Sequence, residues 1–238
     1  MEIVFLGTCH GCAEKGRFYT STLLRTEECS YLIDAGAPFQ TLMKNKDIPV
    51  RELRAAFITH MHGDHASYAP DFAAMCNFEK IHGAIYLPEE QSVSDMKNWI
   101  YALHGEDNYN MGYCKIESAH TESFFDDGNI SAEAIPTHHL KRGVSLAYLI
   151  EHGDKKVLFT GDLSDSFIDF PQTGKTDAVV CELTHFDVKN AISVLNSVKT
   201  DIIIFNHVRD DKVKLLKEND DKISFDYKIA NDGDVFQI

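Results

Sequence analysis

The chain has 238 residues, of which 44% are hydrophobic and 25% are charged. This length and balance suit one sizeable domain with a well-filled core, and they exclude a disordered or low-complexity chain. The 37 acidic residues outnumber the 23 basic ones, and the formal net charge is −14. A surface this acidic repels polyanions, so we expect a small anionic substrate, held in a local basic pocket, rather than long nucleic acid.

The sequence also bears on the compartment. Residues 1–6 are too short and lack the basic lead of a signal peptide, and no apolar run is long enough to span a bilayer. We therefore predict a cytoplasmic protein with no membrane partner, whose six cysteines stay reduced. The pair Cys9-x-x-Cys12 has no second such pair for a structural zinc, and Ala13 follows it instead of a haem-attachment histidine. Its role stays open.

In the first half of the chain, apolar runs and turn residues predict five strands and three helices. The expected strands are Glu2–Leu6, Ser21–Leu24, Ser30–Ile33, Ala55–Ile58 and Ile81–Leu87. The expected helices run from Pro38 to Lys46, from Asp64 to Phe78 and from Pro88 to about His104. Residues 105–114 show no periodicity, so they would form either a lid over a site or an ordinary surface loop.

The second half repeats the mixture of strands and helices. The expected strands are Ile130–Ile135, Ser145–Glu151, Lys156–Thr160, Ala178–Cys181 and Asp201–Phe205. Helices are expected over 188–198 and 211–218, followed by a closing hairpin of Lys222–Lys228 and Asp234–Ile238. Strands followed by strand–helix units, twice over, predict an α/β fold of two sheets packed face to face with helices outside. No repeat or linker divides the chain, so residues 1–238 are expected to form one domain.

Four side chains of metal-ligand type fall within six residues, directly after the expected strand Ala55–Ile58. They are His60, His62, Asp64 and His65. Residues two apart in an extended segment point the same way, so His60 and His62 can share one metal ion. Asp64 and His65 start the following helix and suit a second ion. The alternative is a polar turn with incidental histidines, and four ligand-type residues at this spacing argue against it.

The pattern His-x-His-x-Asp-His after a buried strand resembles the signature of the metallo-β-lactamase superfamily. The segments Leu6-Gly-Thr, Thr20-Ser-Thr and Leu32-Ile-Asp-Ala-Gly resemble most closely its ribonuclease Z-like and phosphodiesterase branches. The resemblance implies an αβ/βα four-layer sandwich, with two mixed sheets inside and helices outside. It also implies that Asp34 lies under the metal loop and anchors the backbone or a ligand imidazole.

The resemblance further implies two divalent ions bound where strands end. The ligands are His60, His62 and His139 for the first ion, Asp64, His65 and His207 for the second, and Asp162 as the bridge between them. The family pattern Pro-Thr-x-His selects His139, and strand alternation places His139 on the face of Thr137. The neighbouring His138 is the alternative ligand.

Further residues are predicted to take part in the chemistry. Asp64 is expected to act in catalysis as well as in metal binding. His185 ends a strand and would serve as a general acid, or else would only hydrogen-bond a loop. Lys141 and Arg142 follow the third ligand and would clamp a phosphate, the alternative being a solvated loop. His10 is a candidate for the edge of the pocket.

The function predicted from these features is that of a metal-dependent hydrolase. Two ions about 3.5–4 Å apart would share a water and generate hydroxide at neutral pH. Zn²⁺ is favoured, although Mn²⁺ or Fe suits the same histidine and carboxylate ligands.

The expected substrates are small phosphodiesters or cyclic phosphates, including cyclic nucleotides. The first alternative is a lactonase or thioesterase of the same fold. The second is a non-enzymatic metal-binding member, which the complete ligand set disfavours. Transfer-RNA processing is also disfavoured, because the chain has no long Gly/Pro-rich insertion to hold RNA. A homodimer is compatible with the sequence.

Overall fold

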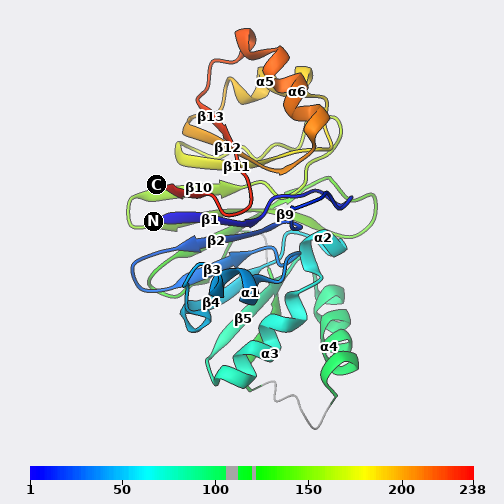
Figure 1. Ribbon diagram of the computed structural model, residues 1–238, viewed down its shortest axis with the longest axis vertical. Coiled ribbons are helices and arrows are strands. Elements are labelled where there is room, and N and C mark those ends of the chain that lie inside the picture. Colours follow the sequence, from blue (N-terminus) through cyan, green and yellow to red (C-terminus); the bar gives the residue numbers. More distant parts are fainter. Residues whose placement is uncertain (106–111, 120–121) are drawn as a thin grey trace.

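The computed structural model describes residues 1–105, 112–119 and 122–238. Two seven-stranded sheets pack face to face in the middle of the molecule, and helices cover their outer faces (Figure 1). The four-layer α/β arrangement expected from the sequence is therefore confirmed. Both chain ends lie on the same side of the molecule, next to the two sheets (Figure 1).

The strands of the first sheet lie in the order β14–β1–β2–β3–β4–β5–β6. Their bounds are β14 Val235–Gln237, β1 Glu2–Gly7, β2 Ser21–Arg25, β3 Ser30–Ile33, β4 Leu53–Phe57, β5 Gly83–Leu87 and β6 Cys114–Ser118. Pairing is antiparallel from β14 to β3 and parallel from β3 to β6. Helices α1 (Phe39–Lys44), α3 (Ala69–Glu79) and α4 (Glu90–His104) lie on this sheet's side of the molecule (Figure 1).

The second sheet has the order β13–β12–β11–β10–β9–β8–β7. Its strands are β13 Tyr227–Ile229, β12 Thr200–Val208, β11 Thr176–Leu183, β10 Lys155–Phe159, β9 Ser145–His152, β8 Ser131–Thr137 and β7 Glu122–Asp126. The first four are parallel, and the remaining pairs are antiparallel. Helices α5 (Val188–Leu195) and α6 (Asp210–Glu218) cover the outer face (Figure 1).

Strand β1 contributes side chains to two layers of the hydrophobic core. Successive side chains of a strand point to opposite faces of the sheet. Ile3 and Phe5 belong to the apolar cluster between the sheets, whereas Val4 and Leu6 belong to the cluster under α1, α3 and α4. A third cluster lies between the second sheet and α5 and α6. The three layers hold the strand ends in fixed positions at the edge where the candidate site lies.

The helix predicted from Asp64 to Phe78 was wrong in one respect, because it is two helices. Helix α2 (Gly63–Ala66) ends before α3 begins at Ala69. A continuous helix would press the ring of Pro70 against the carbonyl of Ala66, four residues earlier, whereas proline in the first turn of a helix is tolerated. The backbone N–H of Tyr68, in the break, donates to the carbonyl of Ala35 at 2.7 Å.

The closing hairpin was also wrong. Strand β13 pairs with β12 in the second sheet, and β14 pairs with β1 in the first, so residues 230–234 cross from one sheet to the other. An unpaired sheet edge is a liability, and each of these short strands covers a different edge. The edge strands β6 and β7 were not predicted. Most of the possible lid at 105–114 lies outside the described residues, while Cys114 begins β6.

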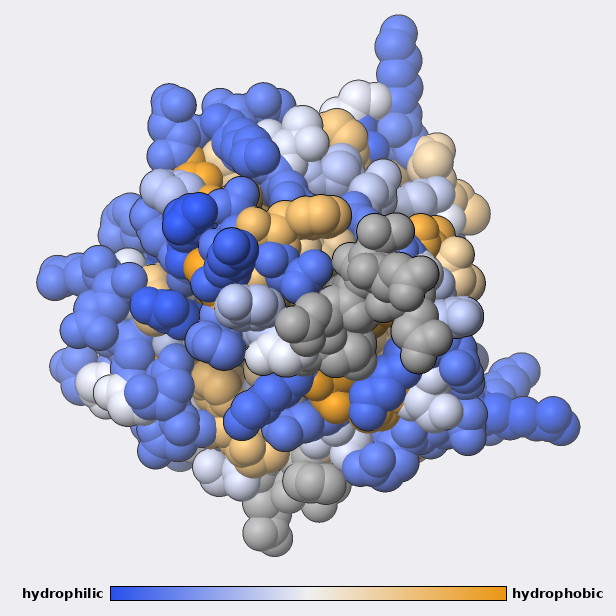
Figure 2. Space-filling view, turned by 90° about the horizontal axis from the view of Figure 1, so that it is seen from below, coloured by the Kyte–Doolittle hydropathy of each residue, from blue (hydrophilic) through white to orange (hydrophobic). Residues whose placement is uncertain are grey.

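The end of the molecule that carries α3 and α4 presents a mostly hydrophilic surface with separate apolar patches (Figure 2). Exposed aromatic side chains on these helices include Phe78 and Tyr101. Within the described ranges, no helix is both long and apolar enough to cross a membrane.

Candidate metal centre

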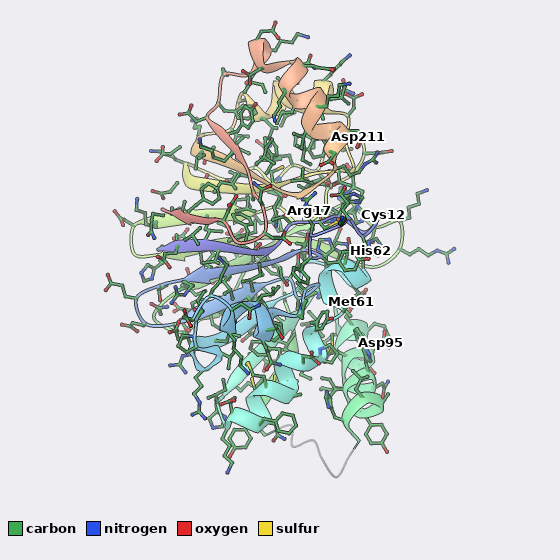
Figure 3. All side chains as sticks on the ribbon, viewed as in Figure 1. Cys12, Arg17, Met61, His62, Asp95 and Asp211 are labelled. Carbon is green, nitrogen blue, oxygen red and sulfur yellow. The ribbon has the colours of Figure 1, made fainter. Side chains whose placement is uncertain are left out.

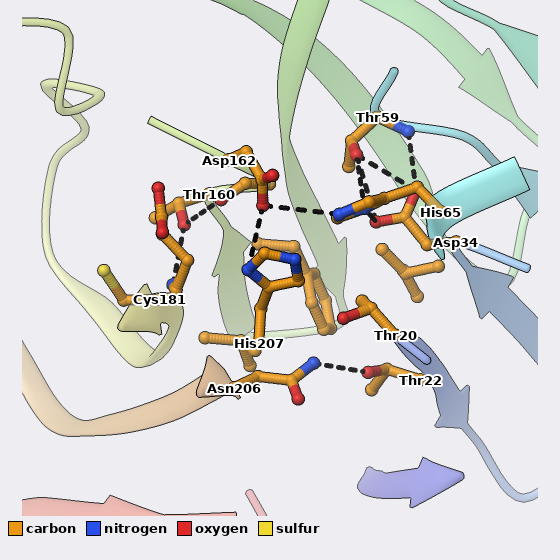
Figure 4. Close-up of a pocket in the computed structure, with 15 residues that line it drawn as sticks. Thr20, Thr22, Asp34, Thr59, His65, Thr160, Asp162, Cys181, Asn206 and His207 are labelled. Carbon is orange, nitrogen blue, oxygen red and sulfur yellow. Dashed lines mark hydrogen bonds and ion pairs between the residues drawn. The ribbon is translucent and has the colours of Figure 1, made fainter. Parts of the chain in front are cut away.

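The side chains predicted to bind metal come from segments far apart in the chain and meet at one edge of the two sheets. His60 and His62 follow β4, Asp64 and His65 lie in α2, His139 follows β8, Asp162 follows β10, and His207 lies at the end of β12. Figure 4 shows Asp162 between His65 and His207. The structure thus brings together every residue of the predicted ligand set.

Asp162 lies at the centre of this arrangement and is buried. Its Oδ2 atom is 3.6 Å from Nε2 of His60 and 3.6 Å from Nε2 of His139. Its Oδ1 atom is 3.4 Å from Nε2 of His65 and 3.4 Å from Nδ1 of His207. These distances exceed those of ordinary hydrogen bonds. One carboxylate therefore presents a different oxygen to each of two histidine groups.

The ligand atoms of the predicted set fall into two groups, in each of which all atoms lie within 4.8 Å of one another. One group contains His60, His62, His139 and Asp162, and the other contains Asp64, His65 and His207. Several of their buried atoms have no hydrogen-bond partner, namely Nε2 of His60, Nε2 of His65, Oδ1 of Asp162 and Nδ1 of His207. Buried polar atoms normally have a partner. Imidazole nitrogens and carboxylate oxygens of this kind fit divalent metal ions.

Burial determines the protonation state of two histidines in the first group. It lowers the pKa of His60 well below the usual value, and it also lowers the pKa of His139. Both imidazoles are therefore neutral near pH 7, which is the form that binds metal. His65 differs: burial opposes its protonation, but the carboxylates of Asp162 and Asp34 outweigh burial and raise its pKa. A cation bound at Nε2 of His65, on the side of Asp162, would take over the role of the proton on that nitrogen.

Asp34 fixes the metal loop from beneath. Its Oδ2 atom accepts a hydrogen bond from Nδ1 of His65 at 2.7 Å, and its Oδ1 atom accepts one from the backbone N–H of Thr59 at 2.8 Å. The first bond turns Nε2 of His65 toward the site and fixes the tautomer. The predicted anchoring role of Asp34 is confirmed, and Asp34 holds both the backbone and a ligand imidazole. The backbone of Asp34 is left-handed, with φ 57°, a conformation that costs free energy and often occurs at functional sites.

Two glycines allow the close packing that places the carboxylates. A Cβ atom on Gly36 would lie 1.8 Å from the backbone oxygen of Asp64. Gly161 has φ +57°, and a Cβ atom there would lie 2.7 Å from the backbone oxygen of Leu146. Neither position can take a larger residue without displacing backbone. The sequences Asp34-Ala-Gly and Gly161-Asp therefore serve the geometry of the ligands.

The two adjacent histidines after β8 are separated by the structure. Nε2 of His139 lies 3.4 Å from Nδ1 of His62, within the first ligand group. His138 is exposed, and its backbone N–H donates to Asp169 at 2.6 Å. The position of His139 agrees with the alternation argument made from the sequence.

We therefore predict that His139→Ala will empty the first metal position and that His138→Ala will not. Loss of a ligand should cost more than the roughly 10–100-fold in metal affinity that loss of an outer partner costs. The measurement is metal content per chain after dialysis against a competing chelator, with His138→Ala as the matched control. The reverse order of the two variants would assign the ligand to His138.

His185 lies beside the two groups and is oriented by Glu182. Oε2 of the buried Glu182 accepts hydrogen bonds from Nδ1 of His185 at 2.8 Å and from its backbone N–H at 2.9 Å. Burial opposes protonation of His185, but the hydrogen bond and charge of Glu182 outweigh it and raise the pKa of His185. The ring centroid of His185 is 4.5 Å from that of His139. Glu182 was not singled out from the sequence, although it lies at the end of a buried strand, three residues before His185.

Lys141 and Arg142 lie in the turn directly after His139, and both are exposed. Neither side chain forms a hydrogen bond or ion pair with another residue of the described ranges. The structure thus places both cations near a ligand but does not bring them into contact with the ligand groups.

Loop 8–18 forms a further wall and is fixed by a residue from the end of the chain. Oδ1 of Asp232 accepts hydrogen bonds from N–H and Oγ1 of Thr8 at 2.8 and 2.7 Å, and its Oδ2 accepts one from the N–H of Phe18 at 2.6 Å. Asp232 lies in the segment that crosses between the sheets. The loop therefore depends on a contact that the sequence analysis did not find.

The same loop reaches the second ligand group. A Cβ atom on Gly11 would lie 3.1 Å from Oδ2 of Asp64. Arg17 donates to the backbone oxygen of Val208 at 3.1 Å, next to His207. Cys12 and Arg17 lie along the edge of the molecule on which His62 lies (Figure 3).

Asp162 also forms a group with Glu182, His185 and His207, and a fourth group of possible ligands, in this loop, consists of Cys9, His10 and Glu14. Nδ1 of His10 accepts from the N–H of Cys12 at 3.2 Å, so Nε2 donates to Glu14 at 3.0 Å. The other oxygen of Glu14 pairs with Arg17 at 2.6 Å. Because the polar atoms of His10 and Glu14 already have partners, these residues stabilise the loop instead of forming a metal site. His10 precedes Gly11 in this loop, and its place at the edge of the pocket stays a prediction.

Comparison with known proteins identifies relatives of this chain. Ribonuclease Z of Listeria welshimeri is 29% identical over 160 residues, covering 66% of this chain and 51% of the relative. Ribonuclease Z of Saccharolobus islandicus is 28% identical over 155 residues, with shares of 65% and 50%. The chain thus spans about half the length of the curated relatives it matches.

Solved structures of similar fold cover nearly the whole chain. The metallo-β-lactamase fold protein YhfI from Bacillus subtilis has a TM-score of 0.78 at 18% identity, covering 99% of this chain and 98% of its own. The short form of human tRNase Z has a TM-score of 0.75 at 17% identity, covering 100% and 99%. A diphosphatase from the PhnP family has a TM-score of 0.69 at 16% identity, covering 100% and 97%.

These relatives confirm the resemblance to the ribonuclease Z-like and phosphodiesterase branches of the metallo-β-lactamase superfamily. A narrower match comes from a family model described as "Anti-Pycsar protein Apyc1", which matches residues 1–221. That range includes every predicted ligand. Since the match extends over most of the 238 residues, the chain belongs to the Apyc1 family of anti-Pycsar proteins.

Proposed function

We propose that this protein is a dinuclear metal-dependent phosphodiesterase that hydrolyses small phosphodiesters or cyclic phosphates. The observation that carries the proposal is the carboxylate of Asp162, which presents one oxygen to each of two histidine groups. Relatives named ribonuclease Z and a structural neighbour named a diphosphatase support a reaction at phosphate.

Each ion would have its own protein ligands. The first would be held by His60, His62 and His139, the second by Asp64, His65 and His207, and both by Asp162. Divalent ions in such a site supply Lewis acidity and activate water at neutral pH. Zn²⁺ is the metal we propose, since histidine and carboxylate ligands suit it.

Asp64 contributes an ionised carboxylate next to the reacting centre. Burial opposes its ionisation, but the hydrogen bond from Nε2 of His207 at 3.0 Å and the charge of His65 lower its pKa below the usual range. The lowered pKa keeps this carboxylate ionised and able to bind a metal ion, and it makes the carboxylate a weak base. We propose that Asp64 takes part in catalysis in addition to metal binding, by accepting a hydrogen bond from the attacking water.

His185 would protonate the leaving group. The carboxylate of Glu182 can only accept hydrogen bonds, so Nδ1 of His185 carries a proton toward it and Nε2 is directed elsewhere. The side chain is 30% exposed, which leaves it accessible to a substrate. Its raised pKa favours the protonated form that a general acid requires.

Lys141 and Arg142 would bind a phosphoryl oxygen through charge-assisted hydrogen bonds. We predict that replacing both with alanine lowers kcat/KM for a phosphodiester by about 1–3 kcal/mol of transition-state binding. The control is the double variant Lys214→Ala, Lys217→Ala on α6, which removes the same charge from the outer face of the second sheet. Steady-state kinetics at constant ionic strength would compare the two. Equal losses would attribute the effect to the overall charge of the protein, and the clamp would be wrong.

The proposal is tested by a panel of substrates offered to the metal-loaded protein. We expect hydrolysis of bis(4-nitrophenyl) phosphate and of a cyclic nucleotide. Structured RNA should be a poor substrate, because the net charge of −14 repels a long polyanion. Efficient hydrolysis of a lactone or thioester with every phosphodiester untouched would overturn the proposal in favour of the carboxylic-ester alternative.

A further inference from the structure

Two members of the first ligand group, His139 and Asp162, lie in loops that no strand pairing joins. His139 follows β8 and Asp162 follows β10, and β9 lies between these two strands in the sheet. Other contacts must therefore hold the loops at the spacing that leaves Oδ2 of Asp162 3.6 Å from Nε2 of His139. The tolerance is small, because ligand atoms lie within about 0.2 Å of their standard distances from a bound ion.

The carboxylate of Asp169 contacts both loops. Its Oδ2 atom accepts a hydrogen bond from the backbone N–H of His138, directly before His139, at 2.6 Å. The two oxygens lie 3.1 and 3.0 Å from the backbone N of Ser164, and Oδ1 also accepts from the hydroxyl of Ser164 at 2.5 Å. Ser164 comes two residues after Asp162. One half-buried side chain thus connects the loop of one ligand to the loop of the other.

The position of Asp169 is itself fixed by the core. Phe167 and Phe170, on either side of it in the sequence, are buried. The ring centroid of Phe167 is 4.3 Å from that of Phe186 and 5.3 Å from that of Phe170. The backbone of Phe167 is left-handed, with φ 57°, and its N–H donates to the carbonyl of Ser164 at 3.0 Å. Such a conformation costs free energy and persists where the surroundings hold it in place.

Two further contacts of the loop after β10 do less to fix its distance from the loop after β8. Oγ1 of Thr137 lies 3.2 Å from the backbone oxygen of Asp162 and 2.9 Å from Oγ of Ser145. A hydroxyl has one proton, so it can donate to one of these acceptors at a time. The N–H of Leu163 donates to Glu182 at 2.6 Å, which ties the loop to β11 instead. The carboxylate described above is therefore the stronger connection between the two loops.

We propose that Asp169 is a positioning residue that sets the spacing between His139 and Asp162, so that both reach the same ion. This inference rests on the proposed function, and in particular on its first metal ion. A carboxylate suits the role, because its two oxygens accept hydrogen bonds from both loops at once. Partners of this kind orient metal ligands, and their loss weakens metal binding.

Release of metal from the loaded protein tests this role. Zn²⁺-loaded wild type and Asp169→Ala would be dialysed against buffers of decreasing free Zn²⁺ concentration, and the ions retained per chain would be counted. We expect one ion of Asp169→Ala to dissociate at about 10–100-fold higher free Zn²⁺ than in the wild type, the loss typical of an outer partner of a ligand. The other ion should dissociate as in the wild type. Equal weakening of both ions, or of neither, would overturn the proposal.

A conservative variant separates the two hydrogen-bonding functions of the carboxylate. The variant Asp169→Asn retains one acceptor oxygen, so it can hold one loop and loses the acceptor for the other. We expect an intermediate loss of affinity for the same ion. This variant also carries the test if circular dichroism shows that Asp169→Ala does not fold. Wild-type retention of both ions in Asp169→Asn would contradict the role.

The matched control is Asp177→Ala, which removes another half-buried carboxylate that joins two segments. Asp177 accepts from the N–H of Lys156 and from Nζ of Lys155, both at 2.9 Å. These contacts lie at the start of β10, the opposite end from Asp162. The control should lower the thermal stability and leave both ions in place. Release of one ion from both variants alike would attribute the effect to general loosening, and the positioning role would be wrong.

Combination with His139→Ala identifies the affected ion. His139→Ala is predicted to lack the first ion, so adding Asp169→Ala should leave retention of the remaining ion unchanged. A further loss would place the effect at the second position and overturn the proposal. Because ions are counted without substrate, the expected release without any phosphodiester hydrolysis would sink the proposed function and leave the positioning role standing. Hydrolysis with unchanged release would sink the positioning role alone.

Discussion

Replacement of Asp162 by alanine is expected to disturb both metal positions and to lower kcat/KM for a phosphodiester by at least about a thousandfold, or roughly 4 kcal/mol. The reason is that its two oxygens face different histidine groups. The variant also removes the negative charge that Asp162 places beside the buried imidazoles. No other residue of the predicted ligand set faces both groups in this way.

The measurement is metal content per chain, determined together with steady-state kinetics and circular dichroism to confirm folding. Asp165→Ala is a matched control, because it removes an exposed carboxylate from the same loop and should change neither property. An Asp162→Ala protein that keeps two ions and full activity would contradict the bridging assignment. Loss of one ion alone would restrict Asp162 to a single position.

The second large effect is expected for His185→Ala, and it should depend on the leaving group. A cyclic phosphate expels a poor alkoxide that needs a proton, and loss of a general acid typically costs about 10²–10⁴-fold. A 4-nitrophenyl ester expels a stable anion, so its hydrolysis should be nearly unchanged. Turnover numbers for both substrates would be compared in the variant and in the wild type.

His138→Ala provides the control for this experiment, since it removes a neighbouring histidine that is exposed. Equal losses for both leaving groups would show that His185 supports the metal ligands instead of donating a proton. Unchanged hydrolysis of the cyclic phosphate would remove His185 from the reaction. Metal content must be measured alongside, because the ring of His185 packs against that of His139.

The positions of the first four ligands could be predicted because these residues lie close together in the sequence. His60, His62, Asp64 and His65 lie within six residues, and alternation in an extended segment fixes the relative directions of His60 and His62. Asp162 and His207 were assigned through the family resemblance, and the apolar runs of β10 and β12 before them placed both residues at strand ends. The arrangement of two sheets followed from the order of strands and helices.

Contacts between distant segments could not be predicted in the same way. Asp232 and Thr8 are 224 positions apart, and nothing in the local pattern pairs them. The strands β13 and β14 resemble a hairpin because they are close in sequence, but each covers the edge of a different sheet. The break between α2 and α3 is a different case. It could have been predicted from the sequence, because Pro70 disfavours a continuous helix.

The central claim is that two ions held by this site carry out phosphodiester hydrolysis. Its most direct test is to titrate metal-stripped, folded protein with Zn²⁺ while following both bound metal and hydrolysis of bis(4-nitrophenyl) phosphate. We expect activity to be absent without metal, to rise until two ions are bound per chain, and to stay constant beyond that ratio. Full activity at one ion per chain, or hydrolysis that does not depend on metal, would contradict the claim.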